Sequence, residues 1–176
     1  MKKAIVFAFL LTLCPALYAQ HPGIAQLLRV KPPALRGYTS EIIASGESTA
    51  APVMIQSSEI KGTFTGLRSI LHIRNSDART ISKVEWRLDV YDEQRRQLHD
   101  TLFLSDDQTV KPGQTAKADS RITRSAESHP KALMPGRAIV LVQLTEISFS
   151  DGSKWAALVE CKASADLKNI TCQPKQ

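Results

Sequence analysis

Few cysteines, few aromatic residues and no recognisable catalytic motif characterise this sequence. Three of its 176 residues are cysteine and 6% are aromatic. The hydrolase patterns GxSxG and HExxH do not occur, so no hydrolytic reaction is indicated. The four histidines show neither HxH nor HxxxH spacing, which leaves no metal-ligand pattern. We therefore expect no cofactor, no metal ion and no catalytic residue.

Long apolar runs are absent as well. The longest, at residues 4–13, is far shorter than the ~20 residues that a membrane-spanning helix needs. Lys2 and Lys3 precede this run, and small residues follow it up to Ala19, where a signal peptidase could cleave. This is the layout of a secretory signal peptide. We expect residues 1–19 to be that signal and the mature chain to have no transmembrane segment. The protein is then exported, either periplasmic or secreted.

The cysteines agree with export. Cys14 lies in the predicted signal peptide and is lost when the signal is removed, which leaves Cys161 and Cys172 as a pair. An even pair in an oxidising compartment predicts a disulfide. A lipid anchor on Cys14 is the alternative to a cleaved signal, but Leu13 is bulky where a small residue is wanted.

Positive charge exceeds negative charge modestly, with a formal net charge of +6 at pH 7. No run of lysine and arginine is longer than two residues, so nucleic-acid binding is not indicated. A basic excess that is spread along the chain gives weak attraction to anionic surfaces.

Six basic side chains form a candidate binding face. Four lie at outward positions of two strands predicted to be neighbours, and two follow in the next turn: Arg68, His72, Arg74, Arg87, Arg95 and Arg96. Such a face could meet an acidic partner, a glycan or an anionic lipid. An ordinary solvated surface is the alternative interpretation.

The chain divides into segments of different composition. Residues 20–50 are rich in proline and glycine, which predicts an extended arm or linker. Residues 51–160 alternate between apolar and polar positions and predict half-buried strands. Residues 161–176 should form a C-terminal disulfide loop and tail. We expect an all-β fold, an antiparallel immunoglobulin- or fibronectin III-like β-sandwich of about seven strands.

The clearest strand covers residues 84–90. Its apolar residues occupy only the even positions, so Trp86 should be buried and Arg87 should face water. The apolar run at residues 139–144 should pack near Trp86, and a change of phase near residues 145–146 predicts a β-bulge.

Two glycines predict tight turns. Pro112 and Gly113 suit the two central positions of a type II turn, because glycine readily adopts positive φ. Asp151 and Gly152 lie between apolar runs, which is a strong hairpin signal.

Three short motifs resemble those of bacterial exported immunoglobulin-like domains of the FxLYD type. They are Ile73-Arg74-Asn75-Ser76, Val90-Tyr91-Asp92 and Val110-Lys111-Pro112-Gly113. The resemblance covers residues 53–158, and it departs from the pattern at Arg95-Arg96, where Asp-Gly is usual. It implies an immunoglobulin-like fold in an extracytoplasmic setting and no catalytic residue.

These observations favour a non-catalytic exported module that binds or assembles with another cell-envelope or extracellular component. The contact could use an exposed edge strand that pairs with a strand of the partner. A purely structural envelope domain without a ligand is one alternative. A small exported hydrolase or metal-dependent enzyme is the other, and a deep pocket with convergent polar groups would favour it.

Overall fold

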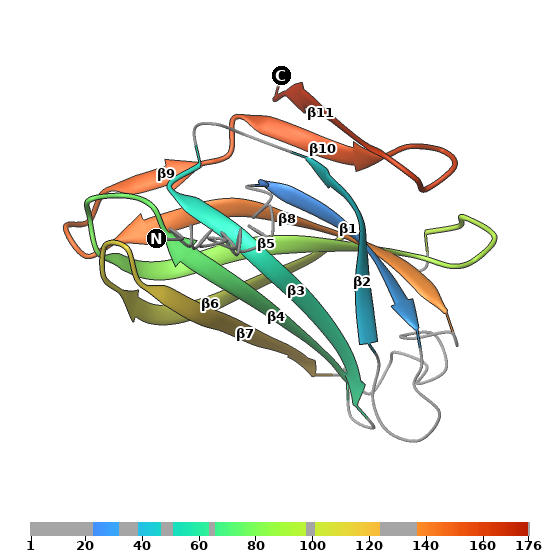
Figure 1. The fold of residues 1–176 in the computed structure, drawn as a ribbon, viewed down its shortest axis with the longest axis horizontal. Coiled ribbons are helices and arrows are strands. Elements are labelled where there is room, and N and C mark those ends of the chain that lie inside the picture. The colour runs from blue at the N-terminus through green and yellow to red at the C-terminus, as the bar shows by residue number, and fades with distance from the viewer. Residues whose placement is uncertain are drawn as a thin grey trace, which may run out of the picture.

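The structure is a computed structural model that describes residues 23–31, 39–46, 51–63, 66–97, 101–123 and 137–175. The predicted signal peptide, Cys14 and the cleavage region lie outside the described residues. Within them the regular elements are all strands, and no helix is long and apolar enough to cross a membrane. Figure 1 shows how the strands are arranged.

The described residues contain eleven strands, which form three antiparallel sheets. The bounds are β1 (Ala25–Lys31), β2 (Thr39–Gly46), β3 (Val53–Thr63), β4 (Gly66–Asn75), β5 (Ile81–Tyr91), β6 (Leu102–Val110), β7 (Thr115–Thr123), β8 (Ala138–Phe149), β9 (Lys154–Ala156), β10 (Val159–Ala163) and β11 (Ile170–Pro174). The largest sheet has the order β2-β1-β8-β5-β6, with β9 also pairing with β8. The second sheet is β3-β4-β7, and β10 and β11 form a hairpin. This architecture is consistent with a β-sandwich.

The core lies between the two larger sheets, and Trp86 of β5 belongs to it. Trp86 is fully buried, and its Nε1 donates a 3.0 Å hydrogen bond to Ser69 Oγ on β4. The even positions of β5 face inward, as predicted, with Leu88 paired to Val142 and Trp86 to Leu144 on β8. The prediction that Trp86 packs near the apolar run at 139–144 is therefore confirmed.

The predicted turns and the predicted bulge are also present. Gly113 has φ 73° and Gly152 has φ 84°, a region that glycine adopts at little cost. The register between β5 and β8 shifts where Glu85 pairs with Glu146 and Trp86 with Leu144. Thr145 is therefore the extra residue of a bulge.

The prediction of an extended arm over residues 20–50 is wrong for the residues described there. β1 lies inside the largest sheet, between β2 and β8. Four of its side chains are completely buried: Ala25, Leu27, Leu28 and Val30. A strand that is buried on both faces carries apolar residues at both even and odd positions. It therefore lacks the alternation of apolar and polar residues that identifies a half-buried strand.

β1 and β9 share one edge of β8. β9 pairs with β8 only from Glu146 to Ser148, and β1 pairs with it from Ala138 to Gln143. At the junction Leu144 N donates to Ile24 O at 2.8 Å, and Ala157 N donates to Thr145 O at 2.9 Å. The N-terminal hairpin thus continues an edge that the short β9 leaves open.

The predicted disulfide between Cys161 and Cys172 is present and joins directly paired residues of β10 and β11. The C-terminal segment is an ordered hairpin rather than a loop and tail, and Cys161 belongs to the buried core. Gly46 of β2 lies beneath it, since a Cβ added there would be 3.0 Å from Cys172 Sγ. The hairpin therefore packs on the outer side of the large sheet (Figure 1).

Replacing Cys161 and Cys172 together with alanine should lower the free energy of unfolding by about 3 kcal/mol without abolishing the fold. The estimate is the chain-entropy value for a short closed loop. The measurement is a urea melt with and without a thiol reductant. Reductant should lower the midpoint of the parent protein and leave that of the double variant unchanged. A double variant that never folds would show that the hairpin is essential to the core.

Candidate functional site

The outer face of the three-stranded sheet gathers basic side chains from β3, β4 and β7. We call it the basic face and define it by Lys61, Arg68, His72, Arg74, Lys117 and Arg121. The register places Lys61, Arg68 and Arg121 directly opposite one another across the three strands. His72 is likewise opposite Lys117. Cross-strand neighbours of this kind lie about 5 Å apart at their Cβ atoms, so the cations are close together.

Asp119 is one of two carboxylates within this face. Arg68 Nε donates to Asp119 Oδ1 at 2.7 Å, and Arg68 Nη2 donates to the second carboxylate oxygen. These bonds lower the pKa of the Asp119 carboxyl against the opposing effect of partial burial, and the charges of Arg121 and Lys117 lower it further. The same pair of hydrogen bonds raises the pKa of Arg68. Asp119 is therefore surrounded by more positive charge than it can neutralise.

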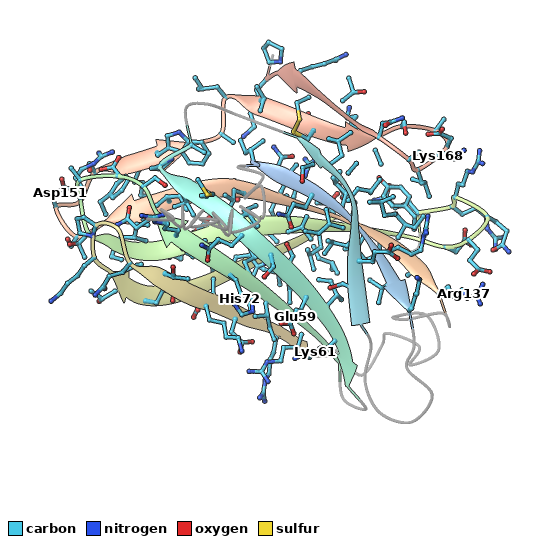
Figure 2. All side chains as sticks on the ribbon, viewed as in Figure 1. Glu59, Lys61, His72, Arg137, Asp151 and Lys168 are labelled. Atoms are coloured by element: carbon cyan, nitrogen blue, oxygen red, sulfur yellow. A yellow bond between two sulfur atoms is a disulfide. The ribbon has the colours of Figure 1, made fainter. Side chains whose placement is uncertain are left out.

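Glu59 is the other carboxylate, on β3 (Figure 2). Lys61 Nζ lies 2.7 Å from Glu59 Oε2, and His72 Nε2 lies 3.2 Å from Glu59 Oε1. The hydrogen bond from Lys61 is the main cause that lowers the pKa of Glu59. Among the described residues Arg74, Lys117 and Arg121 form no salt bridge, although all three are exposed. The basic face thus keeps an excess of positive charge.

Only part of the predicted binding face comes together. Arg68, His72 and Arg74 lie on β4 and belong to the basic face. Arg87 lies on β5, which is in the other sheet, and Arg95 and Arg96 follow in the turn after β5. The two strands predicted to be neighbours are consecutive in sequence, but the turn between them crosses from one sheet to the other.

Lys61, Lys117 and Arg121 belong to the basic face and were not among the predicted residues. Lys117 and Arg121 occupy outward positions of a strand that the alternation identifies, so the signal for their exposure was in the sequence. What the sequence could not supply is the pairing of β3 and β7 on either side of β4.

Arg87 does not face water, contrary to the sequence-based prediction. Its side chain is only 14% exposed, and Nη2 donates a 2.6 Å hydrogen bond to Cys161 O. Gln143, its partner on β8, donates from Nε2 to Val159 O at 2.9 Å and accepts from Cys161 N at 3.1 Å. The two side chains therefore bind the backbone of β10 to the outer side of the large sheet.

Replacing Arg87 with alanine should destabilise the protein by about 2 kcal/mol, because a charge-assisted hydrogen bond is lost and a carbonyl is left unpaired. Arg74 is the matched control, since it is exposed and forms no salt bridge among the described residues. Its alanine variant should change the unfolding free energy by about 0.5 kcal/mol or less. Equal urea midpoints for the two variants would contradict the clamping role of Arg87.

Contrary to the expectation that the sequence contains no SxxK motif, Ser58 and Lys61 have this spacing of some acyl-enzymes, but they lie on opposite sides of β3. Ser58 is buried and its hydroxyl donates to Gln26 Oε1, whereas Lys61 pairs with Glu59 on the outer face. The spacing therefore brings no base to the hydroxyl. In the described part of the chain no three His, Cys, Asp or Glu side chains are grouped to hold a metal ion.

Comparisons with known proteins assign no family to this chain. No family model, no curated protein and no solved structure matches it.

Proposed function

We propose that this protein is a non-catalytic exported binding module, an immunoglobulin-like sandwich that docks the acidic surface of another envelope or extracellular protein on its basic face. The observation that carries the proposal is the row Lys61, Arg68 and Arg121, in which three cations are direct cross-strand neighbours. Like charges placed directly opposite each other destabilise a sheet. A bound anionic surface would relieve that repulsion.

The composition of the face favours a protein partner over a lipid surface. Among the side chains that the structure describes, the large apolar ones that are exposed are Ile42, Phe103 and Leu158, and none of these lies on β3, β4 or β7. Peripheral membrane binding usually adds apolar insertion to electrostatic attraction. The basic face offers charge alone, with arginines whose planar forks suit carboxylates. This proposal moves the contact from an edge strand to the face of a sheet.

Binding to a poly-glutamate probe tests the proposal. The double variant Lys117→Gln with Arg121→Gln should weaken binding about tenfold, because each exposed ion pair contributes up to ~1 kcal/mol. The control is Arg137→Gln with Lys168→Gln, which removes the same charge far from Glu59, Lys61 and His72 (Figure 2). The control should stay within about twofold of the parent, since salt screens distant charges.

If both double variants weakened poly-glutamate binding equally, the net charge of the protein alone would explain the binding. That result would overturn the docking proposal. Binding to vesicles with anionic lipid, without binding to poly-glutamate, would favour a membrane surface instead. The purely structural alternative predicts no binding of either probe.

A further inference from the structure

A second surface, chemically unlike the basic face, lies on the outer side of the large sheet. It is a groove of about 880 Å³ that is floored by β5 and β8 and walled by β6, β9 and the β10–β11 hairpin. Its floor includes Glu85, Arg87, Thr145 and Glu146. The hairpin, which Arg87 and Gln143 hold in place, forms one wall, so the groove depends on the C-terminal segment.

Phe103 forms the opposite wall. It is the cross-strand partner of Arg87 on β6 and therefore stands on the same outer side of the sheet. Its side chain is 73% exposed, although burying a phenylalanine side chain is typically worth about 1.5–3 kcal/mol. An aromatic ring left in water at the rim of a polar groove offers a flat apolar platform to a ligand.

The charges of the groove cancel. Three carboxylates and three cations line it: Glu85, Glu146, Glu160, Arg87, Lys162 and Lys175. Each carboxylate already has a cation, since Glu85 lies 2.6 Å from Lys83 and Glu146 lies 2.7 Å from Lys154. Glu160 lies 3.5 Å from Arg87 and 3.7 Å from Lys162. No carboxylate of the lining is therefore without a cation, and the formal charges of the lining residues sum to zero, in contrast to the basic face.

We propose that this groove binds a neutral oligosaccharide, with one sugar ring stacked on Phe103. A sugar ring presents an apolar C–H face together with hydroxyls that both donate and accept hydrogen bonds. Thr145, Thr171 and Gln173 line the groove and supply both kinds of group. The lining offers only Phe103, Ala156 and Pro174 as apolar residues, and its formal charges sum to zero, so neither apolar anchors nor a net charge would hold a polypeptide there.

The test is titration of the ¹⁵N-labelled protein with three neutral hexasaccharides, namely maltohexaose, cellohexaose and N-acetylated chitohexaose. At least one should shift the amide signals of Thr145, Thr171 and Gln173. Phe103→Ala should weaken that binding about tenfold, which corresponds to the loss of one stacking contact. Leu158→Ala is the matched control, because Leu158 is 79% exposed and does not line the groove. The control should bind like the parent.

The proposal is overturned if none of the three sugars shifts these amides at millimolar concentration, or if binding is the same in Phe103→Ala and the parent. Shifts produced by a mixed-charge decapeptide and by no sugar would assign the groove to polypeptide instead. The outcome is independent of poly-glutamate binding at the basic face, which uses residues of the other sheet.

Discussion

Replacing Trp86 with alanine should leave little folded protein. Trp86 has no exposed surface and lies between the two larger sheets, where its removal leaves a cavity. Truncating a buried tryptophan typically costs about 3–5 kcal/mol, while a domain of this size has only ~5–15 kcal/mol of stability. Ser69 Oγ also loses its 3.0 Å hydrogen bond from Trp86 Nε1. The measurement is the yield of soluble protein together with the midpoint of a urea melt.

Two further variants separate the causes of that loss. Leu158→Ala truncates a large apolar side chain that is 79% exposed, and it should change the unfolding free energy by less than about 0.5 kcal/mol. Trp86→Phe keeps most of the apolar volume but not the hydrogen bond to Ser69, so it should fall between the two. Equal urea midpoints for Trp86→Ala and Leu158→Ala would disprove the burial of Trp86 and the packing of the two sheets against each other.

Deleting residues 1–46 should prevent folding altogether. The deletion removes β1 and β2, which exposes the edge of β8 from Ala138 to Gln143 and uncovers the core beside it. An apolar strand with an open edge pairs readily with other chains, so the product should aggregate. If the segment were an arm or linker, the same deletion would leave a folded domain. Solubility and size-exclusion chromatography of the shortened chain distinguish the two outcomes.

Neighbouring substitutions in β1 give the same test without a deletion. Leu28 is fully buried, and Leu28→Ala should cost about 2–5 kcal/mol. Arg29 is exposed, and Arg29→Ala should cost about 0.5 kcal/mol or less. Similar midpoints in urea would mean that β1 is not part of the core.

Alternation predicted the strands that are buried on one face and failed for those that are not. The strand around Trp86, the Gly113 and Gly152 turns and the Thr145 bulge all follow from local sequence. β1 was missed because both of its faces are covered. β6 (Leu102–Val110) shows no regular apolar alternation, because this sheet-edge strand is largely solvated.

The candidate site shows the same division. The alternation of side chains along β4 correctly predicted that Arg68 and Arg74 point outward, because this alternation depends only on neighbouring residues. Alternation could not predict which strands pair with β4, because strand pairing joins distant parts of the chain. Arg87 was wrongly predicted to face water for the same reason. The hairpin that covers it is distant in sequence, since Cys161, whose carbonyl accepts the hydrogen bond from Arg87, comes 74 residues later.

The place of β1 has a consequence for how the chain reaches its fold. Ala25 pairs with Gln143, so β1 finds its second partner, β8, only when most of the chain has been made. Until then its apolar residues have no permanent cover, and such long-range pairings form slowly. Premature contact with other chains is the main hazard in that interval. We expect the nascent chain to need a holding chaperone, and we expect its refolding after dilution from urea to slow when β1 is weakened by Leu28→Ala.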